Sequence, residues 1–168
     1  MPIALLIWFT AYTSTIVVKF GWLDSISRSW YKWKEKNYSS MFTWFCYGLG
    51  LFLLIFVGTT WPDIKDATAV MFSFGAASIA GVGIAANYKD LYPVRVDRIH
   101  YALSGLAIGC CLIGLWIELS WLYAGLFSAG TIAILVLTKL GKFNNAIFWI
   151  EVLGFYTIDV GLFVIRGR

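Results

Sequence analysis

The sequence predicts an all-α polytopic membrane protein: a six-helix transmembrane bundle that forms a single transmembrane domain over residues 1–168. The first observation is composition, since 60% of the residues are hydrophobic and only 13% are charged, about half of the roughly 25% found in soluble domains. The second is that the apolar residues fall into six long stretches, each near the about 20 residues that a helix needs to cross a bilayer. A soluble chain of this length could not bury so much apolar surface in one core.

The apolar stretches are continuous, whereas the strands of a membrane barrel alternate between apolar and polar residues, so helices are expected. Only residues 118–120 separate the fourth and fifth stretches, which predicts a tight hairpin. The longest connection, residues 23–40, mixes basic and aromatic side chains in the way that is typical of the headgroup layer. The predicted spans are 3–22, 41–60, 67–86, 99–119, 121–137 and 145–165.

Several classes of protein are excluded by composition and motifs. The net charge of +4 is small and spread along the chain, so nucleic acid is not expected as a partner. The single histidine argues against zinc-dependent hydrolysis, which needs about three protein ligands. Cys46, Cys110 and Cys111 lie in apolar stretches without the spacing of a metal site. The sequence has neither a nucleophile elbow nor a P-loop. We therefore expect no cofactor and no metal, and a non-catalytic role is favoured over an enzymatic one.

The distribution of basic residues predicts the orientation. Connections one, three and five, with the residues at their edges, carry ten lysines and arginines, whereas the opposite side carries three. Because positive residues accumulate on the cytoplasmic side, the ten are expected there. The prediction is a multi-pass protein of the cell membrane with both termini outside.

Small residues recur at four-residue spacing in the third and fourth spans. Gly81 belongs to such a stripe in the third span, and Gly105 and Gly109 form one in the fourth. Small residues allow helix backbones to approach closely in a membrane. The stripes are explained either by packing within one chain or by a face through which a homo-oligomer forms.

Two acidic residues, Glu151 and Asp159, lie in the last span. An acid at the centre of a membrane helix costs about 2.5–3.5 kcal/mol on insertion scales, so such residues face the bundle interior. Eight residues rotate the helix by about 80° beyond two full turns and advance it by about 12 Å, which places both carboxylates on one side. They serve either as structural hydrogen-bonding groups or as part of a functional site.

The topology brings further polar residues to the depth of Glu151. His100 opens the fourth span, which crosses in the same direction as the last, and serines follow the first span as it reaches the same side. Arginine pairs with phosphate, and serine and glutamate bind hydroxyl groups, so this set suits a lipid headgroup. Each residue also has a purely structural explanation, such as a turn or a helix cap for Ser25. The predicted ligand-binding residues are Ser25, Ser27, Arg28, Arg95, Arg98, His100 and Glu151.

Four segments carry a resemblance to a known family. They are Ser25-Ile26-Ser27 after the first span, the aromatic and glycine-rich 41–51, Arg98-Ile99-His100-Tyr101-Ala102, and Ala146 to Glu151 at the start of the last span. Their order is similar to that of the small multipass Frag1/DRAM/Sfk1-like proteins and the DUF998-type bacterial membrane proteins. The resemblance implies that the family's polar positions are Ser25 or Ser27, His100 and Glu151, and that the role concerns lipid remodelling or organisation. Tyr101 stands where eukaryotic members have asparagine.

Three functional hypotheses follow from these residues. The first is non-catalytic binding of a lipid headgroup or lipid-like ligand at a polar pocket on the cytoplasmic side, with membrane lipids as partners. The second is a proton or small-cation transporter or channel, whose path would use Tyr156 and Asp159 of the last span. The third is an intramembrane acyl or headgroup transferase with His100 as general base and Glu151 as the residue that orients it. A protein that acts through contacts with other membrane proteins is a further possibility.

Overall fold

The computed structural model describes residues 2–38, 40–61, 63–88, 93–142 and 144–167, with residues 93–97 and 124 described by their backbone alone. Regular structure within this part of the chain is entirely helical, which confirms the all-α class. The elements are α1 (Pro2–Phe20), η1 (Ile26–Arg28), α2 (Ser29–Glu35), α3 (Ser40–Thr60), α4 (Asp66–Asn87), α5 (Pro93–Glu118), α6 (Trp121–Lys139) and α7 (Ala146–Arg166). Six of them are long and apolar enough to cross a membrane, as expected of a multipass membrane protein.

The six long helices begin and end within two residues of the predicted spans, except that α5 begins at Pro93 rather than at Ile99. Proline favours the first turn of a helix, where its missing N–H group has no partner to lose. The apolar stretches therefore located the helices, and the polar residues before Ile99 extend α5 beyond its apolar part.

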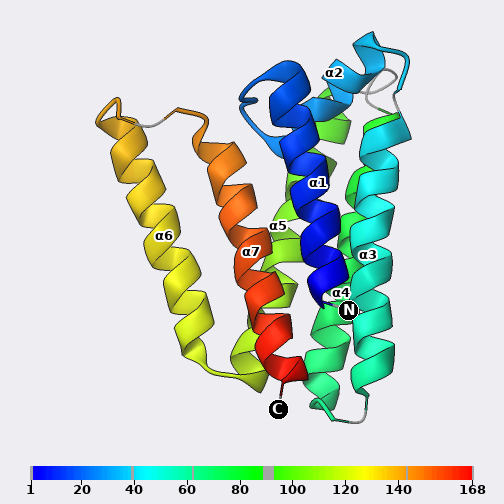
Figure 1. Cartoon of the computed structure of the whole chain (residues 1–168), viewed down its shortest axis with the longest axis vertical. Helices are drawn as coiled ribbons and strands as arrows, with labels where there is room; N and C mark the ends of the chain where they lie inside the picture. The colour runs from blue at the N-terminus through cyan, green and yellow to red at the C-terminus, as the bar shows by residue number, and fades with distance from the viewer. Residues whose placement is uncertain (1, 39, 62, 89–92, 143, 168) are drawn as a thin grey trace.

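Five of the long helices close a ring in which each packs against two neighbours, in the order α1, α3, α4, α5, α7 and back to α1 (Figure 1). The sixth, α6, packs only on the outside of this ring, against α5 and α7. None of its described side chains is buried. The interior of the bundle therefore lies within the ring, and α6 covers one side of it.

Glycines permit a close approach between α3 and α4 within the ring. A Cβ atom on Gly50 would lie 2.9 Å from the backbone oxygen of Ala76, and one on Gly83 would lie 2.9 Å from the Cβ of Cys46. Since hydrocarbon gives no hydrophobic drive between helices, such close packing is what holds membrane helices together. The pair α3 and α4 thus forms a tightly packed wall of the ring.

The small-residue stripes have different surroundings in the structure. Gly81 lies against Leu103 of α5, where an added Cβ would meet the leucine at 3.0 Å. Added Cβ atoms at Gly105 and Gly109 would meet nothing within 4 Å. Gly81 is therefore used in packing within the chain, whereas the two glycines of α5 face open space in the monomer.

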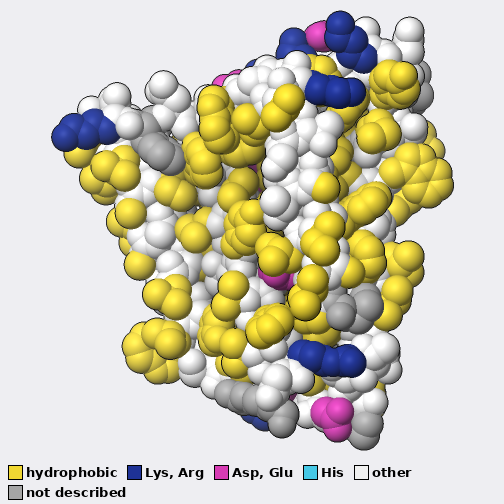
Figure 2. Space-filling view, viewed as in Figure 1, with side chains coloured by type: hydrophobic (Ala, Val, Ile, Leu, Met, Phe, Trp, Pro, Cys, Tyr) yellow, Lys and Arg dark blue, Asp and Glu magenta, His cyan; other side chains and the backbone are white. Residues whose placement is uncertain are grey.

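On the face drawn in Figure 2, most charged side chains lie toward the two ends of the molecule, and apolar side chains predominate between them. We call the end that carries α2 the basic end, since the connections with ten lysines and arginines meet there. At the opposite end, the carboxylate of Glu118 accepts hydrogen bonds from the backbone N–H of Lys65 and the hydroxyl of Thr68, both at 3.0 Å. The apolar belt between two polar ends is the surface expected of a protein embedded in a bilayer.

The connection after α1 forms η1 and α2 across the basic end of the ring, an arrangement that sequence reasoning did not predict (Figure 1). Trp30 and Trp33 are each only 2% exposed and belong to the core. Ile26, Trp30 and Trp33 recur at helical spacing, and all three are buried. That periodicity could have predicted a buried helical face in this segment. The neighbouring lysines instead made the segment resemble a solvated connection.

Candidate functional site

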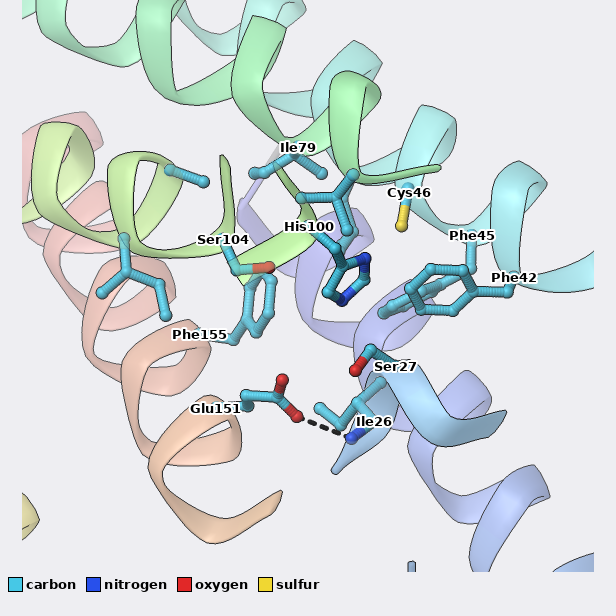
Figure 3. A pocket seen from close by; sticks show the side chains of 14 residues that line it. Ile26, Ser27, Phe42, Phe45, Cys46, Ile79, His100, Ser104, Glu151 and Phe155 are labelled. Atoms are coloured by element: carbon cyan, nitrogen blue, oxygen red, sulfur yellow. Dashed lines mark hydrogen bonds between the residues drawn. The ribbon is translucent and has the colours of Figure 1, made fainter. Parts of the chain in front are cut away.

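A cavity of about 50 Å³ with a mostly apolar lining lies inside the ring beneath η1, at the basic end (Figure 3). Four of its lining residues carry polar side chains: Ser27 of η1, His100 and Ser104 of α5, and Glu151 of α7. Figure 3 shows the polar atoms of these four side chains turned toward the space between them. The remaining lining residues are apolar: Ile26, Phe42, Phe45, Cys46, Leu49, Ile79, Val82, Ala107, Ile108 and Phe155. The structure therefore brings together Ser27, His100 and Glu151, which lie far apart in the sequence.

Glu151 links α7 to the segment that covers the cavity. One of its carboxylate oxygens, Oε2, accepts a hydrogen bond of 2.6 Å from the backbone N–H of Ile26 (Figure 3). The backbone N–H of Phe148 donates to the carbonyl oxygen of Asp24 at 3.0 Å, one turn earlier on α7. Two hydrogen bonds thus hold η1 against the start of α7, while the second carboxylate oxygen of Glu151 faces the cavity.

Two serines shape the segment above the cavity. Ser25 is the N-cap of η1, and its hydroxyl accepts from the backbone N–H of Arg28 at 3.2 Å. The hydroxyls of Ser25 and Ser27 lie 2.9 Å apart and are hydrogen-bonded. Ser25 does not line the cavity, but it holds the adjacent Ser27 in place. The capping role that the sequence offered as an alternative for Ser25 is therefore the role that the structure gives it.

Ser25→Ala is expected to lower the stability of the folded chain by about 1 kcal/mol, the usual cost of losing an N-cap side chain. Ser25→Asn, which restores an accepting oxygen, should recover most of the loss. The measurement is the thermal midpoint of the purified protein in detergent. Equal midpoints for the alanine variant and the wild type would show that the cap contributes nothing.

His100 is held deep in the bundle. Its side chain is 2% exposed, and the centre of its ring lies 6.1 Å from that of Phe42 on α3. The first turns of α5 reach the basic end, so the imidazole enters the cavity from the side opposite Glu151. A buried imidazole beside a carboxylate and two hydroxyls can donate and accept hydrogen bonds, as a polar ligand requires.

The residues that line the cavity differ in burial. Ser104 and Ile108 on α5, and Glu151 and Phe155 on α7, are partly exposed, whereas the lining residues of η1, α3 and α4 are buried. The lining is therefore least buried where α5 and α7 contribute to it, on the side where α6 packs.

A second and larger cavity, of about 620 Å³, lies on the surface of the basic end next to η1 and α2. Ser27 lines both cavities, so the two sites meet at this residue. Arg28 lines the outer cavity and forms an ion pair with Asp24, with 2.9 Å between its Nη1 and the carboxylate oxygen. The remaining lining residues are Trp22, Leu23, Tyr31, Lys32, Glu35 and Tyr101.

Other predicted residues lie elsewhere. Arg98 is exposed and lines neither of these cavities, and the side chain of Arg95 lies outside the described residues. The hydroxyl of Tyr156 is 3.1 Å from that of Thr10 on α1. Asp159 is buried and lines neither cavity. Both acids of α7 thus turn toward the bundle, as expected, but the two cavities include only Glu151.

Several lining residues were not identified from the sequence. Ser104 lies one turn after His100 on the same face of α5, so its four-residue spacing from the histidine was an available signal. Asp24, Lys32 and Glu35 join the outer cavity because the segment that forms η1 and α2 lies across the basic end of the ring, which composition does not reveal. Where side chains are described, no three His, Cys, Asp or Glu residues converge closely enough to hold a metal ion.

Comparisons of this chain with models of protein families, with curated proteins and with solved structures find no match. The geometry of the two cavities and the chemistry of the residues that line them are therefore the features that indicate a function.

Proposed function

We propose that this protein binds a membrane lipid or lipid-like molecule at its basic end, without a catalytic cycle. The observation that carries the proposal is the convergence of Ser27, His100 and Glu151 on one cavity whose remaining lining is apolar. Polar groups at membrane depth are costly and are retained where they meet a polar partner. A molecule with an apolar chain and a polar end matches both parts of the lining.

The size of the cavity fits part of such a molecule. A volume of about 50 Å³ accepts a hydroxyl, an amine or a few water molecules, but not a whole headgroup. The outer cavity, which shares Ser27, offers about 620 Å³ for the bulkier part. The ligand would therefore lie across Ser27, with one polar group inside the ring and the rest at the membrane surface.

The same proposal includes an orientation and a location. The basic end would face the cytoplasm, because positive residues accumulate on that side of the cell membrane, and both termini would lie outside. Copies of the chain would associate through the open face of Gly105 and Gly109 on α5.

Native mass spectrometry of the full chain, purified with its lipids, tests the proposal. The wild type is expected to retain lipid, and His100→Ala should retain about tenfold less, the loss that follows when one hydrogen bond to a charged or strongly polar group disappears. Leu112→Ala is the control, because it removes comparable side-chain volume from the half of α5 that lies away from the cavity. Identical lipids in identical amounts for His100→Ala and the wild type would refute the proposal.

A further inference from the structure

The outer cavity contains a balanced set of charges. Among its described lining residues, Arg28 and Lys32 are cationic, and Asp24 and Glu35 are anionic. Arg28 pairs with Asp24 at 2.9 Å and Lys32 with Glu35 at 3.2 Å. The cavity therefore offers two positive and two negative groups, and their net charge is zero.

Both ion pairs are exposed, so a charged ligand could replace one partner in each. The side chains of Arg28 and Asp24 are 65% and 61% exposed, and those of Lys32 and Glu35 are 42% and 60% exposed. Exposed pairs of this kind contribute little to stability, so each partner can turn to a ligand at small cost. A molecule that carries both a phosphate and an ammonium group could replace both partners at once. An anionic headgroup would satisfy only the cations and would leave the two carboxylates facing it.

Aromatic rings complete the lining. Trp22, Tyr31 and Tyr101 all border the cavity, and all three are at least 40% exposed. Tryptophan and tyrosine are typical of the membrane interface, where phospholipid headgroups lie. Aromatic ring faces also attract ammonium groups. The aromatic side chains thus add affinity for the cationic half of a headgroup, and they place the cavity at headgroup depth.

From these observations we infer that the outer cavity binds the headgroup of a zwitterionic phospholipid, of the phosphoethanolamine or phosphocholine type. The phosphate would contact Arg28 and Lys32, and the ammonium group would contact Asp24, Glu35 and the aromatic rings. This assignment rests on the proposed function, since it names the class of lipid that the site selects.

The experiment offers the full chain an equimolar mixture of phosphatidylethanolamine, phosphatidylcholine and phosphatidylglycerol in detergent, and measures retained lipid by native mass spectrometry. The wild type is expected to retain each zwitterionic lipid about fivefold more than phosphatidylglycerol, the selectivity that about one exposed charge pair supplies. The double variant Asp24→Asn, Glu35→Gln keeps both cations and should shift the preference to phosphatidylglycerol. Because all four side chains are exposed, this variant is expected to fold normally.

Asp63→Asn, Asp66→Asn is the matched control: it removes two exposed carboxylates at the opposite end and should keep the wild-type preference. If the wild type retained all three lipids equally and His100→Ala retained less of each, the headgroup assignment alone would be overturned. Retention of no lipid would overturn the proposed function as well. Binding of soluble phosphocholine or phosphoethanolamine without binding of the lipids would overturn a membrane lipid as the ligand.

Discussion

Glu151→Leu is expected to reduce lipid retention at least about tenfold, and to lower the stability of the folded chain by about 1–3 kcal/mol. The carboxylate has two tasks in the structure: one oxygen accepts the 2.6 Å hydrogen bond from Ile26, and the other faces the cavity. Leucine removes both and leaves the backbone N–H of Ile26 without its acceptor. The two readouts are native mass spectrometry for bound lipid and the thermal midpoint in detergent.

Two variants separate these tasks. Glu151→Gln keeps an oxygen that can accept from Ile26, so its thermal midpoint should stay near the wild-type value while lipid retention still falls. Asp159→Asn neutralises the other acid of α7, which lines neither cavity, and should leave lipid retention unchanged. If Asp159→Asn lost as much lipid as Glu151→Leu, binding would not depend on the cavity. A pH-dependent ion flux into liposomes that disappears with Asp159→Asn would favour transport instead.

Gly50→Ala should produce the largest loss of stability among single methyl additions in the α3–α4 contact, about 1–3 kcal/mol. The added Cβ would lie 2.9 Å from the carbonyl oxygen of Ala76, a backbone atom that cannot turn away as a flexible side chain does. The helices must therefore separate, and close packing is lost along their contact. The measurement is the thermal midpoint, or the urea or SDS concentration at half unfolding.

Gly58→Ala provides the matched control for Gly50→Ala. Gly58 lies on the same helix, and an added Cβ there would meet no atom within 4 Å. Alanine is the better helix former, so this variant should be as stable as the wild type or slightly more stable. Equal midpoints for the two variants would show that α3 and α4 are not packed as closely as described.

The helices of the ring follow from the sequence because hydrocarbon imposes a simple requirement. A span must be apolar over its full length and must satisfy its own backbone hydrogen bonds, so continuous apolar stretches suffice to locate α3 and α4 within one residue. The connections obey no such rule. Residues 26–35 are rich in charge yet fold onto the ring, because the buried faces of Trp30 and Trp33 outweigh the lysines between them.

The sequence predicted which polar residues share one membrane depth, but not which of them line a common cavity. Alternating spans bring His100 and Glu151 to one end, and the structure shows that they also share one cavity. The arginines were harder to place, since a long, flexible side chain at a helix end reaches many positions. Arg28 pairs with Asp24 in the outer cavity, and Arg98 lines neither cavity. The hydrogen bond from Ile26 to Glu151 is donated by a backbone N–H group, and a pattern of side chains does not predict which backbone groups form such bonds.

The peripheral position of α6 has a consequence for the order of the chain. None of its own described side chains is buried, yet the polypeptide must travel back across the bilayer before α7 begins. At about 1.5 Å per residue, its 19 residues cover nearly the whole hydrocarbon thickness. Without that return passage the last helix would enter from the far leaflet, and its acid would meet Glu118 and Lys65 instead of the imidazole. The number of times that the chain crosses the membrane, rather than any contact that α6 makes, therefore determines that Glu151 lies at the basic end.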